Sequence, residues 1–256
     1  MNLIFALRSS LVLILSALFS IGCGGNPSSS VNRKAPAGTG FKVLQADIGK
    51  KDKSKYSIFV PFNYDPKVKS PAIVFLHGLF EGGSDGVKNT TVGLGPIIAK
   101  DPKKYPYIIL FVQTGGGGWT SDREYDKVIA VLDDASRRYS IDPDRVTLTG
   151  LSTGGRGVWG TAAKYPTRFA ALVPICGYEV KKAVEKIKNI PTWAFHNRGD
   201  PFVNSSASSN MVKWIQKAGG NAKVSLYGAV GHDAWSRAYR DKELWTWIAS
   251  QRRPAN

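Results

Sequence analysis

Three side chains in the second half of the chain have the types and the order needed for nucleophilic catalysis. Ser152 is the centre of a Gly-x-Ser-x-Gly motif, and Asp200 and His232 each follow a short apolar segment. A serine hydroxyl becomes a nucleophile when an imidazole takes its proton, and that imidazole needs an acceptor on its other nitrogen. The sequence therefore predicts Ser152 as nucleophile, His232 as general base and Asp200 as the acid that orients it.

The motif around Ser152 stands between an apolar segment at 145–149 and a stretch with helical spacing that begins near Gly155. A strand that turns into a helix within one residue strains its central residue, and only small neighbours let the two backbones approach. Gly150 and Gly154 meet that need. The alternative interpretation is a glycine-rich helix cap with an ordinary serine.

Two other residues compete for the roles of acid and base. Asp233 is a second candidate acid, but it adjoins His232 and is poorly placed to orient that ring. His196 is a second candidate base, although it precedes Asp200 at the end of an apolar segment and otherwise lines the site or has a structural role.

An acyl-transfer site also needs two backbone donors for the tetrahedral oxyanion. The residue after the nucleophile, Thr153, supplies one. The glycine-rich loop that follows the apolar segment 72–76 supplies the other, and Leu79 is the candidate donor with Phe80 as the alternative. A plain turn between a strand and a helix is the other interpretation of this loop.

The elements that position these residues alternate along the chain. Segments 41–48 and 55–62 have apolar residues at every second position and predict an antiparallel hairpin at a sheet edge. Short apolar segments suit strands buried on both faces, at 72–76, 107–112, 146–149, 171–175, 192–195 and 224–227. Helical spacing is found at 122–139, 156–165, 180–188, 206–218 and 242–250. This order predicts an α/β fold with a doubly wound, mostly parallel sheet, whose site lies at the carboxyl ends of the strands.

The first 40 residues have a different composition. Residues 1–22 carry one charge, Arg8, before an apolar segment, which is typical of a secretory signal peptide. Cys23 follows a small residue and resembles the lipidated cysteine of bacterial lipoproteins, although Ser20 stands where that motif usually has leucine. Residues 23–40 form a flexible, lipid-anchored tether, and 41–256 form the catalytic domain. Localisation in the cell envelope is expected, or periplasmic or extracellular if the signal is simply cleaved.

Composition limits the possible classes of protein. The chain has 256 residues, 43% of them hydrophobic, which excludes disordered, collagen-like and coiled-coil proteins. Two cysteines and three histidines exclude a disulfide scaffold and several metal sites, and Cys176 is expected to be a buried free thiol. The net charge of +16 is spread along the chain; it suggests attraction to an anionic surface and, in an exported protein, not to nucleic acid.

With these residues in place, the chain resembles the α/β-hydrolase superfamily. More closely it is similar to bacterial secreted esterases and predicted peptidases near the polyhydroxybutyrate-depolymerase, feruloyl-esterase and phospholipase/carboxylesterase groups. Thr153 departs from these relatives, which carry methionine or another larger residue there. No long insertion is present to form a large lid, so an open site is expected. The matching segments are 76–78, 141–146, 150–155, 165–171, 174–177 and 231–235.

The glycine-rich segment 113–119 lacks the lysine and the spacing of a phosphate-binding loop, so we interpret it as a rim of the cleft. Trp119 in this segment is a candidate platform for substrate, with packing as the alternative. Trp235 and His77 are further candidate substrate-binding residues, and core packing is the alternative for Trp235.

These observations predict a serine hydrolase that cleaves carboxylic esters, small or polymer-linked, through an acyl-enzyme. The machinery needs no cofactor or metal. Two alternatives remain, namely a peptidase or amidase that uses the same triad and a tethered binding protein on a hydrolase scaffold, because a fold alone does not guarantee activity.

Overall fold

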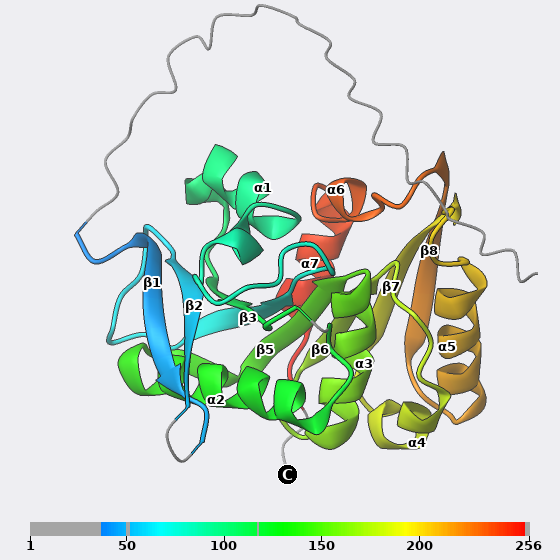
Figure 1. The fold of residues 1–256 in the computed structure, drawn as a ribbon, viewed down its shortest axis with the longest axis horizontal. Coiled ribbons are helices and arrows are strands. Elements are labelled where there is room, and N and C mark those ends of the chain that lie inside the picture. Colours follow the sequence, from blue (N-terminus) through cyan, green and yellow to red (C-terminus); the bar gives the residue numbers. More distant parts are fainter. Residues whose placement is uncertain (1–36, 50–51, 117, 254–256) are drawn as a thin grey trace, which may run out of the picture. The chain divides into compact units, whose positions relative to one another are not determined.

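The computed structural model describes residues 37–49, 52–116 and 118–253, and Figure 1 shows an eight-stranded sheet with helices around it. The strands lie in the order β1-β2-β4-β3-β5-β6-β7-β8. Their bounds are β1 Gly40–Asp47, β2 Lys53–Val60, β3 Ser70–Leu76, β4 Ile108–Val112, β5 Ile141–Leu151, β6 Ala171–Ile175, β7 Thr192–Gly199 and β8 Ala222–Val230.

The sheet is mostly parallel. Strands β3 to β8 pair only in parallel with one another, whereas β2 pairs antiparallel with both β1 and β4. The predicted N-terminal hairpin is therefore confirmed. Every residue of β4 and β6 is buried, as expected for strands covered on both faces. This sheet with its antiparallel N-terminal strands is the α/β-hydrolase fold.

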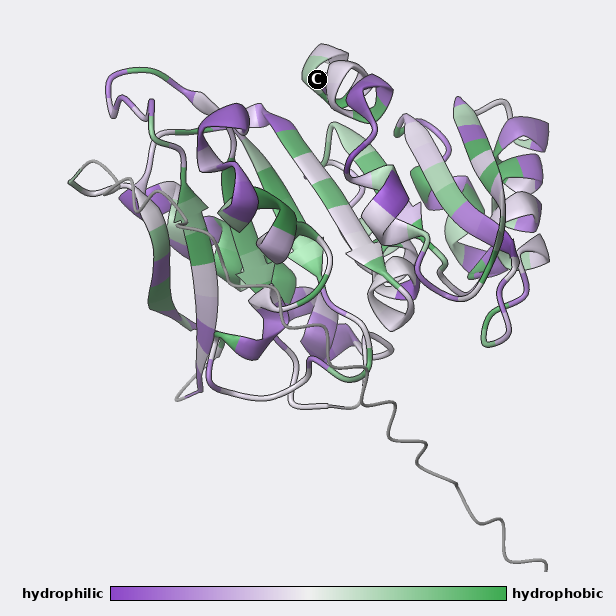
Figure 2. Cartoon of the chain, turned by 90° about the horizontal axis from the view of Figure 1, so that it is seen from above, coloured by the Kyte–Doolittle hydropathy of each residue, from purple (hydrophilic) through white to green (hydrophobic). Residues whose placement is uncertain are grey.

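Helices cover the two faces of the sheet in two groups, as a doubly wound sheet requires (Figures 1 and 2). One group packs against the larger core cluster: α2 Asp122–Arg138, α3 Thr153–Lys164, α4 Val184–Ile187 and α5 Ser206–Lys217. The other packs against the smaller cluster: α1 Leu94–Lys100, α6 Trp235–Ala238 and α7 Lys242–Ser250. Three short 3-10 helices complete the described chain: η1 Lys88–Thr90, η2 Pro102–Lys104 and η3 Lys181–Ala183.

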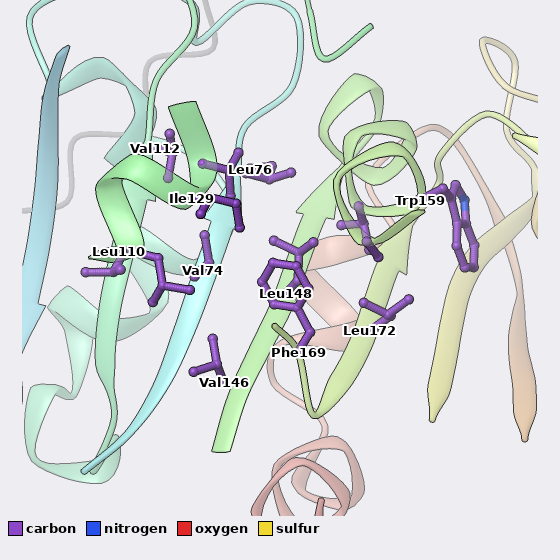
Figure 3. Close-up of a cluster of buried hydrophobic side chains, with 14 of the residues drawn as sticks. Val74, Leu76, Leu110, Val112, Ile129, Val146, Leu148, Trp159, Phe169 and Leu172 are labelled. Atoms are coloured by element: carbon purple, nitrogen blue, oxygen red, sulfur yellow. The ribbon is translucent and has the colours of Figure 1, made fainter. Parts of the chain in front are cut away.

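Alternate residues of strands β2 to β7 point into the two clusters. Val74 and Leu148 belong to the larger one with Trp159 of α3, as Figure 3 shows, while Phe75 belongs to the smaller one. This alternation anchors the strand ends from both sides. The loops that carry the candidate catalytic residues therefore start from a fixed edge.

The structure differs from the predicted elements in a few places. Helix α1 and the short helix α6 were not expected, and the segment predicted as one helix at 180–188 is divided into η3 and α4. Cys176 is a buried free thiol, as predicted. The predicted signal peptide, Cys23 and most of the tether lie outside the described residues. No helix in the described part of the chain is long and apolar enough to cross a membrane.

Candidate active site

Ser152 lies at the junction of β5 and α3 in a backbone conformation that few residues adopt. Its φ is 57° and its ψ is −120°, between a strand that ends at Leu151 and a helix that begins at Thr153. A positive φ costs a non-glycine residue of order 1–3 kcal/mol and persists only where the surroundings impose it. The backbone N–H of Ser152 donates to the carbonyl of Ile175 at 2.9 Å, which fixes the turn against β6.

The glycines around Ser152 are required by close backbone contacts. A Cβ at Gly154 would lie 2.1 Å from the carbonyl oxygen of Leu76, and one at Gly150 would lie 2.6 Å from the carbonyl oxygen of Gly154. Both distances are far below contact with backbone atoms that cannot rotate away. The sharp turn predicted from the motif is therefore present, and the role of Ser152 as nucleophile stays a prediction.

Asp200 and His232 are held together by a short hydrogen bond. Nδ1 of His232 lies 2.5 Å from Oδ2 of Asp200, whose side chain is fully buried. Burial by itself raises the pKa of Asp200, but hydrogen bonds from the backbone of Val203, from His232 and from the backbone of Phe202 outweigh it and hold the pKa below its ordinary value. The carboxylate is thus ionised and fixed in front of the ring.

Cys176 lies beside both Ser152 and the Asp200–His232 pair. A ring nitrogen of His232, a carboxylate oxygen of Asp200 and Cys176 Sγ all lie within 4.8 Å of one another. Burial raises the pKa of the Cys176 thiol, and hydrogen bonds with the backbone of Ser152 and Ala234 lower it by less. No hydrogen bond joins Ser152 Oγ to His232 Nε2 among the described residues. Hydrogen bonds between a nucleophile and its base often tighten only with substrate bound, and the pairing of Ser152 with His232 stays a prediction.

Cys176, Asp200 and His232 form a group of described side chains whose ligand atoms are close enough together to be considered as a metal site. Ligand atoms around a tetrahedral metal ion stand roughly 3.3 Å apart or more. The 2.5 Å separation of His232 Nδ1 and Asp200 Oδ2 is shorter than this, and Cys176 is buried. The geometry fits a shared proton better than a coordinated ion.

The candidate oxyanion donors lie beside the nucleophile. Thr153 is the first residue of α3, where backbone N–H groups have no partner within the helix. The loop after β3 touches Ser152, since a Cβ at Gly78 would lie 3.6 Å from the Ser152 Cβ. Within the described ranges, the N–H groups of Thr153, Leu79 and Phe80 donate no hydrogen bond. All three are thus available, and the choice between Leu79 and Phe80 stays a prediction.

His77 and Trp119 were predicted to bind substrate, and the structure shows that both are buried instead. His77 is 1% exposed, its Nδ1 donates to the carbonyl of Gly78 and its Nε2 accepts from the N–H of Thr114. Trp119 is fully buried, and its Nε1 donates to the carbonyl of His77 at 2.9 Å. These two side chains tie the loop after β3 to the loop after β4, so the prediction is wrong for both.

The competing acid and base are occupied elsewhere. Asp233 accepts hydrogen bonds from the backbone N–H and hydroxyl of Ser236 at the start of α6. His196 is fully buried, with Nδ1 2.7 Å from Ser208 Oγ and Nε2 2.9 Å from the carbonyl of Val203. Burial lowers the pKa of His196, which keeps the ring neutral. Neither residue is available for the role that it was considered for.

A cleft of about 720 Å³ lies beside these groups. Its lining includes Thr153, Arg156, Glu179, Phe202 and Asn210, together with Gly118 of the glycine-rich loop. The Phe202 ring packs edge-on against His232, with 5.6 Å between centroids, and Trp235 packs on the same imidazole at 5.5 Å. Trp235 is partly buried, so it combines contact with the candidate base and packing on the smaller core cluster.

Large apolar side chains are exposed on the loops that surround the site. Leu79 and Phe80 follow β3, Phe202 follows β7, and Val230 ends β8. Phe80 is 81% exposed, Phe202 is 75% exposed and Val230 is 88% exposed. We call these four residues the apolar rim. Phe202 belongs both to this rim and to the lining of the cleft.

Solved structures with the same fold include several hydrolases. A thermostable esterase aligns with a TM-score of 0.76 and 30% identity over 83% of this chain and 63% of its own. A ferulic acid esterase aligns with a TM-score of 0.66 and 17% identity over 82% and 99% of the two chains. The acylaminoacyl peptidase of Pyrococcus horikoshii, with a TM-score of 0.62 and 13% identity, covers 85% of this chain and 43% of its own, and shares the fold alone.

The sheet order and the strained turn at Ser152 place the chain in the α/β-hydrolase superfamily. The Dienelactone hydrolase family matches residues 28–243, and the chain belongs to this family of hydrolases. A relative among characterised proteins is the bifunctional acetylxylan esterase/xylanase XynS20E of Neocallimastix patriciarum, with 24% identity over 160 residues. The match covers 61% of this chain and 23% of that enzyme.

Proposed function

We propose that this hydrolase cleaves carboxylic esters through an acyl-enzyme on Ser152. The observation that carries the proposal is the strained Ser152 at the carboxyl edge of the sheet, with the Asp200–His232 pair bordering the same buried Cys176. A strained turn of this kind exposes a serine at the place where the fold binds ligands.

The residues divide the reaction into two steps. Ser152 Oγ attacks the acyl carbon while His232 Nε2 takes its proton, and the N–H groups of Thr153 and Leu79 hold the oxyanion. The bond to the alcohol then breaks, and His232 gives the proton to the leaving oxygen. In the second step a water molecule, activated by His232, releases the acid and restores Ser152.

The more similar relatives are named as esterases, and this supports esters over amides as the proposed substrates. The solved structure at 30% identity is an esterase, and the relative from Neocallimastix patriciarum is named as a bifunctional acetylxylan esterase/xylanase. The acylaminoacyl peptidases share the fold at 13–14% identity, which says nothing about substrate. Small esters and esters linked to a polysaccharide are the proposed substrates.

A fluorophosphonate probe and a series of 4-nitrophenyl esters test the proposal. The full-length protein should be labelled and should release 4-nitrophenol, and Ser152→Ala should lose both. Labelling that persists unchanged in Ser152→Ala would overturn the assignment of the nucleophile. Hydrolysis of 4-nitroanilides at rates that match the esters would favour the peptidase alternative. If the intact protein is neither labelled nor active, the chain is better described as a binding protein.

The location of the protein is part of the same proposal. The sequence supports export through residues 1–22, acylation of Cys23 and a tether over 23–40, which would hold the catalytic domain of residues 41–256 at a membrane surface. An esterase at that place would meet soluble or polymeric esters from outside the cytoplasm. The basic net charge of +16 would attract the domain to anionic envelope surfaces.

A further inference from the structure

The cleft beside Ser152 contains a positively charged side chain that no other group in the described residues neutralises. Arg156 lines the cleft and is half-buried. In the described ranges its guanidinium makes no hydrogen bond, ion pair or aromatic contact. Arg198 is the other described arginine of which this is true, but it is exposed and does not line the cleft. The remaining described arginines all have such a partner.

A guanidinium in a cleft is a specific recognition group. Its planar set of N–H donors matches the two oxygens of a carboxylate, and the attraction is strongest where water is partly excluded. Glu179, an acidic residue that lines the same cleft, forms no ion pair with Arg156 and instead accepts from Asn210 Nδ2 at 3.3 Å. Arg156 is therefore free to bind an anion that enters the cleft.

The position of Arg156 indicates which part of an ester it faces. Arg156 lies one helical turn after Ser152 on α3, a rise of about 6 Å along the axis, and its N–H donates to the carbonyl of Ser152. The cleft is also lined by Phe202, which packs against His232. The base gives its proton to the leaving oxygen, and we infer from this contact that the departing alcohol lies toward the cleft.

We propose that Arg156 binds a carboxylate on the alcohol part of the substrate, a few bonds from the ester oxygen, so that the enzyme favours acyl esters of hydroxy acids or acidic sugars. This inference rests on the proposed esterase function and names its substrate class. Glu179, whose carboxylate borders the same cleft, opposes the binding of such an anion and moderates the preference.

The test compares two aryl acetates of the same shape, the anion 3-acetoxybenzoate and the neutral 3-acetoxybenzamide, in the full-length protein. The ratio of their kcat/KM values should fall about ten- to a hundredfold in Arg156→Gln, the range expected for loss of a charged hydrogen bond. Arg156→Lys should lose less of the ratio, because the charge remains without the paired donors. Glu179→Gln should raise the ratio.

Two further measurements complete the test. One is a matched control variant, and the other is a pair of esters that carry the charge on the acyl side. Arg252 lies near the start of β5 at the other end of the sheet, 3.7 Å from Asp142, and Arg252→Gln removes the same charge without changing the ratio. The monoester of glutaric acid with 4-nitrophenol and its glutaramate analogue place the charge on the acyl side. A ratio in Arg156→Gln within about twofold of the unmutated protein overturns the inference, and so does a charge effect on the acyl-side pair alone.

The failure of this inference differs from failure of the proposed function. One outcome is that the unmutated protein hydrolyses the esters 3-acetoxybenzamide and 4-nitrophenyl acetate while Arg156→Gln leaves the ratio of kcat/KM for the charged and neutral esters unchanged. In that case the esterase function stands and the anion site does not. If no ester is hydrolysed, both proposals fall. Circular dichroism of each variant confirms that a lost ratio does not come from a lost fold.

Discussion

The carboxylate of Asp200 is held from several directions. Oδ1 accepts from the backbone N–H groups of Phe202 and Val203 at 2.9 and 3.0 Å, and Oδ2 faces both His232 at 2.5 Å and His196 at 3.3 Å. A carboxylate fixed in this way places the proton of His232 on Nδ1. In the neutral ring Nε2 is then the acceptor, which is the arrangement that the proposed role of general base requires.

Replacement of Asp200 by asparagine tests this role. The amide of Asp200→Asn would keep the size of the side chain but would favour the other tautomer of His232, so we expect kcat for 4-nitrophenyl acetate to fall by about 10⁴ with a small change in KM. Asp233→Asn is the matched control, because among the described residues the hydrogen bonds of the Asp233 carboxylate come from Ser236. Equal loss in the two variants would contradict the assignment of the acid.

His77 connects the pH of the solution to the stability of the fold. Burial lowers the pKa of His77 from 6.5 to about 4, so the ring stays neutral in the folded state while it becomes protonated in the unfolded chain. The folded state is therefore most stable with respect to His77 above pH 6.5, where the ring is neutral in both the folded and the unfolded chain. The contribution of His77 to the free energy of unfolding, about 3 kcal/mol, is lost progressively as the pH falls from 6.5 to 4.

Urea unfolding at pH 7.5 and pH 4.5 measures this effect. Between these two pH values the unmutated protein should lose about 2 kcal/mol more free energy of unfolding than His77→Gln, which has no group that titrates there. His196, whose pKa is also lowered, is present in both proteins and cancels. The same loss in both proteins would show that His77 is not the group responsible.

At the scale of elements, the junction between β5 and α3 depends on the approach of α3 to the end of β3. The carbonyl oxygens of Leu76 and His77 would lie 2.1 and 2.5 Å from a Cβ at Gly154. Because both are backbone atoms, the helix as a whole would have to move away from the strand. Such a movement would also separate Thr153 from the loop that carries Leu79.

Gly154→Ala should therefore lower the free energy of unfolding by about 3 kcal/mol and remove most esterase activity. Gly228→Ala is the control, because Gly228 has no atom within 4 Å of a Cβ and no positive φ. Thermal unfolding and 4-nitrophenyl acetate hydrolysis measure the two effects. A stable Gly154→Ala protein with full activity would show that the junction tolerates a wider separation than the contacts imply.

The elements that the sequence predicts well are those with a strong local signal. Strand β6 was predicted with its observed bounds, and the turn at Ser152 was predicted from two glycines and its place between a strand and a helix. Helix α1 was not predicted, because it has seven residues, begins after Gly93 and includes Gly95 and Pro96. A segment that short gives little periodicity from which to recognise a helix.

Burial of individual loop residues was harder to predict than their chemistry. His77 and Trp119 have the side-chain types of a substrate site, yet they contact each other between two loops. Trp119 donates to the His77 carbonyl, and their rings lie 5.2 Å apart. That contact joins residues 42 positions apart in the chain. No pattern within either loop indicates it, which is why local reasoning placed both residues in the cleft.

At the scale of the whole molecule, the predicted anchor can be tested directly. Cys23→Ser should release the protein from the membrane fraction of a bacterium that processes lipoproteins and should abolish incorporation of an alkyne-tagged fatty acid. Cys176→Ser is the control, because the other cysteine is buried in the catalytic domain and should not affect either readout. If the unmutated protein is found in the soluble fraction and does not incorporate the tagged fatty acid, a simply cleaved signal peptide is the better interpretation.

The apolar rim has a practical consequence for any use of this protein outside water. Phe80, Phe202 and Val230 are largely uncovered, and all of them stand at the carboxyl edge of the sheet, where Ser152 lies. On a bubble, an oil droplet or a hydrophobic resin these side chains would leave the solvent first. Adsorbed molecules would then face the support with their entrance covered, so immobilisation through the basic surface should preserve more turnover than immobilisation by adsorption.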